Sequence, residues 1–173
     1  MQQVYITKER IKSLRENNAI LKSVGALCKC TLSIEDDIVI VKGDAFDEFI
    51  AKNIIYAYGR GFDIIDAEAL IEEGKYFASI DLRQAFGSDK RIKQVKARII
   101  GEHGRTKKYM EQVSEAKISV YGDTVSFIGT NEGIAEAQAA VNALIEGRTH
   151  KTAYDKMEAM HRRNKEALRN PSF

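Results

Sequence analysis

The second half of the chain repeats the apolar pattern of the first half at a distance of 86 residues. The two halves align without a gap over this stretch, and the matched positions are Leu32 with Ile118, Ile34 with Val120, Val39 with Val125, Val41 with Phe127, and Gly43 with Gly129. Self-similarity at a fixed distance is typical of chains built from copies of one structural unit. The sequence therefore predicts two domains with one fold.

The second copy shows the order of elements most clearly. Apolar and polar residues alternate over 77–82 as in a half-buried strand. Ser88 or Asp89 can cap the helix that follows, and Gly101 ends it. The remaining predicted elements are a helix after Gly104, a hairpin of strands over 117–121 and 124–128, and a helix capped by Asn131. The inward-facing positions of these helices are expected to be Ile92, Val95, Ile99, Tyr109, Met110, Val113, Ile134, Ala137, Val141, Leu144 and Ile145.

The first copy follows the same β-α-α-β-β-α order. Its predicted elements are a strand over 4–6, a helix capped by Thr7 with Ile11 and Leu14 inside, a helix over about 20–27, strands over 31–34 and 38–41, and a helix with Phe46, Phe49, Ile50 and Ile54 on one face. A short helix over 63–73 links the copies, and a basic helix over about 152–168 follows the second. The prediction is an α+β chain with domains over 1–76 and 77–150 and a basic C-terminal helix and tail over 151–173.

The two halves differ in charge. The net charge of +2 divides into −3 for residues 1–76 and +5 for residues 77–173. Such asymmetry indicates a polyanionic partner for the basic half. The densest basic stretch, from Lys90 to Lys108, holds eight Lys or Arg residues, opposed inside it only by Glu102. A solvated helix face is the plain alternative for such a run.

The basic stretch contains Gly101-Glu102-His103-Gly104, the one G-x-x-G spacing in the chain, at a predicted turn between two helices. Glycines let a backbone bend sharply and approach a phosphate closely. The start of the next helix presents unpaired N–H groups and a partial positive charge. The sequence therefore predicts a clamp for the backbone of single-stranded RNA.

Cationic and apolar residues around this loop complete the predicted site. Full charges are expected from Lys93, Lys96, Arg98, Arg105, Lys107 and Lys108, with Arg148 and Lys151 beyond them. An apolar floor for unstacked bases is expected from Ile99, Ile100, Ile118 and Val120. The first copy has Arg15-Glu16-Asn17-Asn18 at the equivalent place, without glycine, so its loop is degenerate.

The segment R-I-I-G-E-H-G-R-T-K-K-Y-M, residues 98–110, resembles the KH signature of the archaeal two-KH ribosome-assembly proteins and of their eukaryotic relatives, the partner-of-Nob and KRR factors. The likeness continues through Ile128-Gly129, residues 135–140 and residues 146–150, and covers nearly the whole chain. The small loop residue usual in that family is His103 here, which puts the loop's contacts in question.

This resemblance implies two tandem type I KH domains. It also implies binding to the 3′ region of small-subunit ribosomal RNA during its maturation, with a pre-rRNA endonuclease and a translation initiation factor as partners. It implies no catalytic activity and no cofactor.

Other classes of site have less support in the sequence. Cys28 and Cys30 form a C-x-C pair, but no second Cys or His pair lies at a ligand-like spacing, so no metal site is predicted. No apolar run is long enough to span a bilayer, and the first residues do not resemble a signal peptide. A cytoplasmic protein without a membrane partner is expected.

Three alternative functions stay open at this point. A KH protein could use the same clamp on messenger RNA or in translation initiation. A nuclease would need a nucleophile or metal ligands beside Glu102 and His103, and none is apparent there. The acidic turn over 35–37 is more typical of a solvated loop than of a metal site. A protein scaffold without RNA binding conflicts with the basic stretch.

Overall fold

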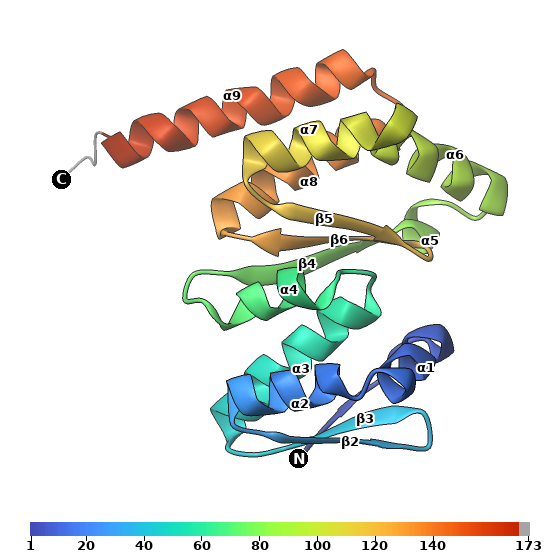
Figure 1. The fold of residues 1–173 in the computed structure, drawn as a ribbon. Helices are drawn as coiled ribbons and strands as arrows, with labels where there is room; N and C mark the ends of the chain where they lie inside the picture. The colour runs from blue at the N-terminus through green and yellow to red at the C-terminus, as the bar shows by residue number, and fades with distance from the viewer. Residues whose placement is uncertain (170–173) are drawn as a thin grey trace. The chain divides into compact units, whose positions relative to one another are not determined.

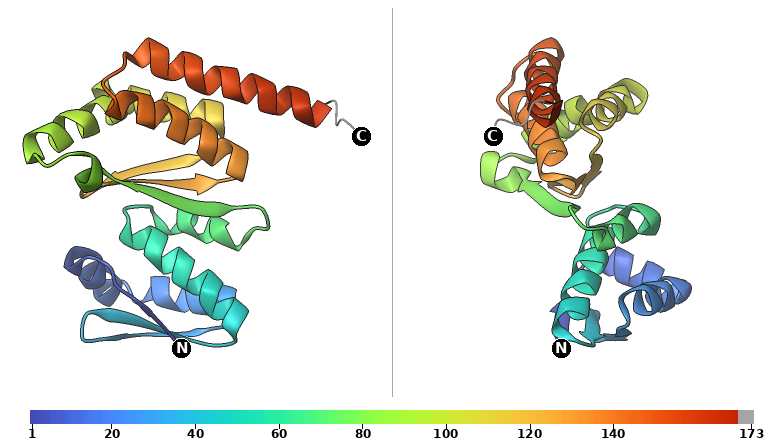
Figure 2. Two further views of the ribbon diagram at one scale, coloured as in Figure 1. Left: turned by 180° about the vertical axis from the view of Figure 1, so that it is seen from behind. Right: turned by 90° about the vertical axis from the view of Figure 1, so that its left-hand side faces the viewer.

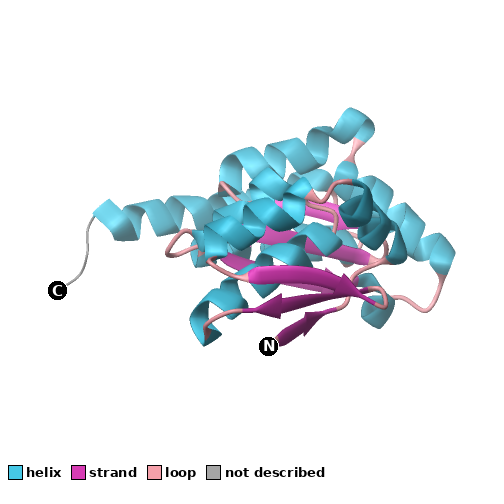
Figure 3. Ribbon diagram, turned by 60° about the horizontal axis from the view of Figure 1, so that its bottom comes forward, coloured by secondary structure: helices cyan, strands magenta, loops and turns pink. Residues whose placement is uncertain are grey.

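The computed structural model describes residues 1–169, so the end of the predicted tail, 170–173, lies outside the described residues. The chain forms two compact units, Met1–Phe77 and residues from Ala78 onward. In each unit a three-stranded sheet has its helices packed on one face (Figures 1 and 3).

The elements of the first unit are β1 (Gln2–Val4), α1 (Lys8–Glu16), α2 (Ala19–Cys28), β2 (Thr31–Glu35), β3 (Ile38–Lys42), α3 (Ala45–Gly59), α4 (Ile64–Glu68) and the 3-10 helix η1 (Ala69–Ile71). β4 (Tyr76–Asp81) crosses the boundary between the units. The second unit continues with α5 (Leu82–Ala85), α6 (Asp89–Ile100), the 3-10 turn η2 (Glu102–Gly104), α7 (Arg105–Ser114), β5 (Lys117–Tyr121), β6 (Thr124–Gly129), α8 (Asn131–Ile145) and α9 (His150–Arg169).

The predicted repeat is confirmed in the pairing of the strands. Leu32 lies opposite Val41 in the first hairpin, and 86 residues later Ile118 lies opposite Phe127. Shifting α2, β2 and α3 by 86 residues gives the bounds of α7, β5 and α8. The sheet orders, β1-β3-β2 and β4-β6-β5, also correspond. Register is shared because a one-residue slip would turn the apolar side chains out of the core.

The core of the second unit lies between its sheet and its helices. The predicted stripe of Ile92, Val95 and Ile99 is buried, and Met110 of α7 and Phe127 of β6 complete the centre. Burial of such side chains contributes roughly 1.5–3 kcal/mol each. The other predicted inward positions are buried as well or pack against this core: Tyr109, Val113, Ile134, Ala137, Val141, Leu144 and Ile145.

Several element boundaries differ from the predictions. The first strand, β1, covers Gln2–Val4 instead of 4–6, and α9 begins at His150 instead of about residue 152. Thr130, rather than Asn131, caps α8, because its extended backbone lets Oγ1 accept from the Gly133 N–H at 3.1 Å. Asp81 caps α5 in the same way, so Leu82 leaves the predicted strand. The linker helix ends at Glu68, and the chain continues as the 3-10 helix η1.

The predicted apolar face of α3 is wrong at its first turn. Phe46 and Phe49 are 74% and 55% exposed, whereas Ile54 is fully buried. The buried stripe runs at i, i+3 and i+7 from Glu48 through Ala51 and Ile55, which places the two phenylalanines off that stripe.

The last helix, α9, lies along α7 and α8 (Figures 1 and 2). It buries Ala153 and Met157. Farther along, the buried carboxylate of Glu136 accepts from His161 Nδ1 at 2.8 Å and from Asn164 Nδ2 at 2.7 Å. The basic helix is therefore part of the second unit. Within residues 1–169 no helix combines the length and the apolar character needed to cross a bilayer.

Candidate nucleic-acid interface

The loop between α6 and α7 has a backbone that depends on glycine. Gly101 has φ 76° and ψ 174°, a combination found almost only in glycine. A Cβ atom at Gly101 would lie 2.2 Å from Thr106 Oγ1 and 2.8 Å from the Thr106 nitrogen. Gly104 (φ 75°) and His103 (φ 52°) also occupy the left-handed region. Three left-handed residues within four positions turn the chain sharply between the helices.

The side chains within the loop point outward. Those of Glu102 and His103 are 80% and 79% exposed, and His103 Nε2 lies 3.7 Å from the Glu102 carboxylate. The side chain of His103 therefore faces solvent. Its left-handed conformation is one that histidine adopts more readily than most residues do.

The N-terminus of α7 follows directly and is open. Gly104 is its N-cap, and no side chain of the described residues caps the helix. The first turn of a helix carries unpaired N–H groups and a partial positive charge, both of which favour a phosphate. The loop and α7 together form a backbone cradle for an anion.

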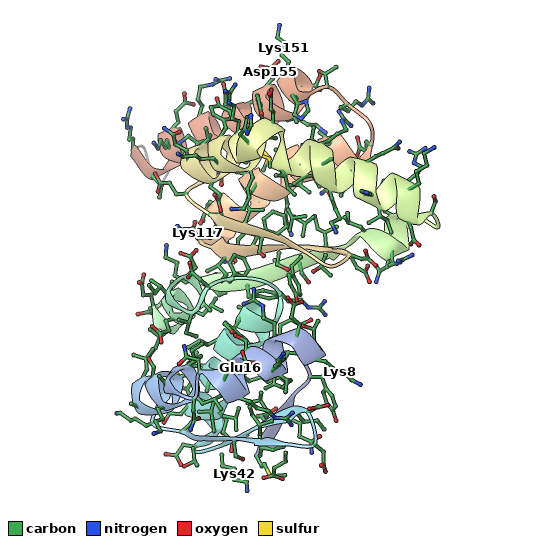
Figure 4. All side chains as sticks on the ribbon, turned by 45° about the vertical axis from the view of Figure 1, so that its right-hand side comes forward. Lys8, Glu16, Lys42, Lys117, Lys151 and Asp155 are labelled. Atoms are coloured by element: carbon green, nitrogen blue, oxygen red, sulfur yellow. The ribbon has the colours of Figure 1, made fainter. Side chains whose placement is uncertain are left out.

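Most of the predicted cations surround the cradle on the surface. Lys93, Arg105, Lys108 and Lys151 are exposed, Lys96 is partly exposed, and none of these five pairs with a carboxylate within residues 1–169. Lys151 projects from the first turn of α9 (Figure 4). Arg148 is exposed, with its Nε 4.0 Å from the Glu146 carboxylate.

Two predicted cations are already engaged. Lys107 Nζ lies 3.0 Å from Glu111 Oε1, and that oxygen also accepts from the Ile118 N–H at 2.8 Å. The Arg98 guanidinium donates to the Leu144 carbonyl at 2.9 Å and to the Arg148 carbonyl. Arg98 therefore holds the end of α8, where unpaired carbonyls need donors.

Replacing Arg98 with alanine is expected to lower the free energy of unfolding by about 1–3 kcal/mol, because the two carbonyls lose their donors. The salt dependence of RNA binding should stay unchanged, since the guanidinium is already occupied. Chemical denaturation and salt titration measure the two quantities. A changed slope at constant stability would contradict this role.

The predicted apolar floor needs correction. Ile99 and Ile118 are 0% and 2% exposed, so they belong to the core and present no surface to bases. Ile99 lies on the inner stripe of α6, and Ile118 faces inward opposite Phe127. Only Ile100 and Val120 keep partial exposure.

A shallow hollow lies beside the cradle, between α7 and the start of β5. It is lined by Lys108, Glu111, Gln112, Glu115, Ala116 and Lys117. Lys108 is the lining residue nearest in sequence to the Gly101–Gly104 loop. The corresponding place in the first unit is also a hollow, lined by Asn18, Leu21, Lys22, Gly25, Ala26, Cys30, Thr31 and Leu32.

The equivalent turn of the first unit has no comparable cradle. Residues 15–18 contain no left-handed residue, and α1 continues through Glu16. Arg15 is paired at 2.9 Å with Asp37 of the hairpin turn. In the second unit the equivalent aspartate, Asp123, pairs instead with Arg83 at 2.7 Å, away from the loop.

Both cysteines are free thiols, and Cys28 is buried. Burial, followed by the neighbouring Cys30, raises the pKa of the Cys28 thiol to about 11, so it stays protonated at neutral pH. Among the described residues, no three His, Cys, Asp or Glu side chains are grouped to hold a metal ion.

Comparison with known proteins places the second unit in one class. Residues 76–162 match the family model of the PNO1 second KH domain, described as a eukaryotic-type KH domain, KH-domain type I. KH domains bind single-stranded nucleic acid through a G-x-x-G loop. The fold and the loop thus define a KH-domain protein.

Relatives specify the family. The chain is 34% identical over 117 residues to the KH domain-containing protein MJ0443 of Methanocaldococcus jannaschii, covering 68% of this chain and 52% of that protein. It is 30% identical over 121 residues to the pre-rRNA-processing protein PNO1 of Chaetomium thermophilum, covering 68% and 46%. The chain spans about half the length of these curated relatives.

Solved structures extend the likeness to both units. Dim2p from Pyrococcus horikoshii OT3 is 31% identical with a TM-score of 0.84, covering 91% of this chain and 98% of that one. A chain in the a/eIF2alpha-aDim2p-rRNA complex from the same organism is 30% identical with a TM-score of 0.84, covering 93% of each. The chain belongs to the PNO1/Dim2p family of KH-domain proteins.

The sequence did not reveal the supports of the loop. Thr106 packs against Gly101 and accepts from the Tyr154 hydroxyl at 3.2 Å, while His150 Nε2 donates to the Arg98 carbonyl at 2.9 Å. His150 and Tyr154 lie at i and i+4 of α9, but the helix predicted from the sequence began at about residue 152 and did not include His150. Their spacing indicates a shared face, without indicating what that face contacts.

Proposed function

We propose that the second unit binds single-stranded RNA through the Gly101–Gly104 loop, and that its target is the 3′ region of small-subunit ribosomal RNA during maturation of the subunit. The observation that carries the proposal is the glycine cradle at the start of α7. Within residues 1–169 no side chain caps this helix, and the neighbouring cations Lys93, Arg105 and Lys108 pair with no carboxylate. The name of the Chaetomium relative and the rRNA in the Pyrococcus complex support the choice of target.

The first unit is proposed to be a second KH domain, giving two tandem type I domains with a basic C-terminal helix. Its element order and hairpin register equal those of the second unit. Its turn lacks the cradle, and Arg15 is occupied by Asp37. We assign it no RNA contact.

We propose two protein partners for this chain and a cellular compartment in which it meets them. The Pyrococcus complex contains a/eIF2alpha, which supports an initiation factor as a partner of this chain. A pre-rRNA endonuclease is the second proposed partner, because the role proposed for this chain is to bind the RNA while another protein cuts it. Both interactions are proposed for the cytoplasm.

The target is tested by comparing short single-stranded RNAs of equal length. One carries the 3′ end of the small-subunit rRNA from the source organism, one a messenger leader, and one a scrambled sequence. We expect the rRNA fragment to bind at least about tenfold more tightly, a difference typical of sequence readout. Equal affinities would overturn the rRNA target, and absence of binding would overturn the RNA function itself.

The salt dependence of binding should count the phosphate contacts. Each contact to a single strand adds about −0.7 to the log–log slope, so a clamp on about four nucleotides gives about −2 to −3. Lys108→Ala should make the slope less steep by about 0.7. Lys8→Ala, which removes an exposed lysine of α1 (Figure 4), is the matched control and should leave the slope unchanged.

A further inference from the structure

The first turn of α9 reaches both sides of the RNA-binding loop. His150 and Tyr154 lie one helical turn apart, so they share a face of α9. His150 Nε2 donates to the Arg98 carbonyl near the end of α6, at 2.9 Å. The Tyr154 hydroxyl donates to Thr106 Oγ1 at the start of α7, at 3.2 Å. One turn of helix thus contacts the chain just before and just after Gly101–Gly104.

The contact through Thr106 is transmitted directly to the loop. Thr106 is 6% exposed, and its side chain lies against Gly101 so closely that no Cβ fits between them. Interiors packed at this density pass displacements on instead of absorbing them. A shift of Thr106 would therefore change the position of Gly101.

Additional contacts hold Tyr154 in place. Its ring packs on Tyr109 with a centroid distance of 4.6 Å, and the Tyr109 hydroxyl donates to Glu158 one turn farther along α9. The hydrogen bond to Glu158, together with burial, raises the pKa of Tyr109, so its hydroxyl remains a donor. Tyr154 consequently has one well-defined position against α7.

The opposite side of the loop is fixed by the same helix. Arg98 donates to the carbonyls of Leu144 and Arg148, and its own carbonyl accepts from His150. The end of α6 is therefore tied to the connection between α8 and α9. Neither tie involves a side chain of the loop itself.

Such supports matter because the loop holds His103, which is not a glycine, in the left-handed region at φ 52°. Residues in sparsely populated φ/ψ regions cost of order 1–3 kcal/mol each and persist only where their surroundings fix them. A cradle fixed before the phosphate arrives binds more tightly than one that must be ordered on binding. We propose that His150 and Tyr154 are positioning residues that hold the Gly101–Gly104 cradle in its RNA-binding conformation. This inference rests on the proposed function of the loop.

The direct test is Tyr154→Phe, which keeps the ring stack and removes the hydroxyl. We expect the dissociation constant for single-stranded RNA to rise about five- to tenfold, since Thr106 loses its hydrogen bond. The amide signals of Gly101 and Gly104 in nuclear magnetic resonance spectra should shift. His150→Phe, which removes the donor to Arg98, should act in the same direction.

Two controls separate positioning from general stability. Tyr5→Phe makes the same chemical change at a tyrosine that is 65% exposed in the first unit and should change neither affinity nor the glycine signals. Asn164→Ala loosens α9 at Glu136, far along the helix from the loop, and should lower the free energy of unfolding while leaving affinity within about twofold. Loss of affinity in Asn164→Ala equal to that in Tyr154→Phe would overturn the proposal.

A double-mutant cycle tests whether Tyr154 affects RNA affinity through the Gly101–Gly104 loop. In a chain that already carries Glu102→Asp and His103→Asp, Tyr154→Phe should cause a much smaller loss than in the native chain, because the loop then contributes little to binding. An independent, additive loss would overturn positioning through the loop. If the native protein shows no loop-dependent binding, the proposed function fails; if it does, and Tyr154→Phe binds like the native chain, only this inference fails.

Discussion

Replacing both Glu102 and His103 with aspartate is expected to weaken binding of single-stranded RNA by at least about tenfold. The change places a second carboxylate at the cradle, where the phosphate is expected. Two like charges about 4 Å apart repel by roughly 1 kcal/mol in water and about 4 kcal/mol near a protein surface, which corresponds to about five- to several-hundredfold in affinity. Aspartate tolerates the left-handed conformation of His103, so the backbone should persist.

Fluorescence anisotropy with a labelled rRNA fragment measures this loss. Both side chains are about four-fifths exposed, so the free energy of unfolding should change by less than about 0.5 kcal/mol. The loss should shrink as salt is added, because exposed charges are screened. Asn17→Asp with Asn18→Asp makes a corresponding change in the first unit and should alter affinity less than twofold. Native-like binding by the Glu102 and His103 double variant would remove the loop from the RNA site.

The fold was predictable where the same pattern of apolar, core-facing residues occurs in both halves of the chain. The alternation of Leu32, Ile34, Val39 and Val41 determines the register of the first hairpin, and its second copy determines the other. Such patterns report which side chains face the core of their own element. Phe46 shows the limit of this method, because apolar side chains on two neighbouring stripes of a helix do not reveal which stripe faces the core.

The position of the candidate loop was predictable from the sequence. Which of the neighbouring side chains are available to a ligand was less predictable. Gly101 and Gly104 were identifiable because their spacing and their place between two helices have a direct physical consequence. Arg98 and Lys107 looked like their neighbours in the sequence, yet the fold gives each of them a protein acceptor. The charge of Arg98 does not identify its hydrogen-bond partners. They lie about 50 residues away in the sequence, at and just after the end of α8, and only the fold brings them close.

Comparison of the two units gives a physical description of their divergence. The bounds of α2, β2 and α3 correspond to those of α7, β5 and α8. The units also share a left-handed residue directly after α2 and α7, Lys29 in one and Glu115 in the other. They differ at the loop, where Arg15 stands in place of Gly101 and pairs with the hairpin turn. A cation bound to a carboxylate cannot equally serve a phosphate. The same fold therefore carries one open cradle and one turn closed by an ion pair.

The two glycines of the cradle should respond very differently to alanine. Gly101→Ala is expected to lower the free energy of unfolding by about 2–4 kcal/mol, because Gly101 combines a conformation reserved for glycine with a backbone atom of Thr106 only 2.8 Å from the new Cβ. Gly104→Ala should cost about 1–2 kcal/mol, since its φ of 75° and ψ of 10° are left-handed helical values and no atom lies within 4 Å of the new Cβ.

Chemical denaturation of the two variants measures this difference in stability. Titration with RNA then measures the affinity of each variant. Because the Cβ of Gly104→Ala would enter open space at the start of α7, it should hinder the phosphate more than it disturbs the fold. We expect affinity to fall several-fold while most of the stability remains. Gly87→Ala is a matched control, since Gly87 is exposed with no atom within 4 Å of its added Cβ and lies ahead of α6. Equal stability losses at positions 101 and 104 would contradict this prediction. They would show that the contact between Gly101 and Thr106 does not determine the conformation of the loop.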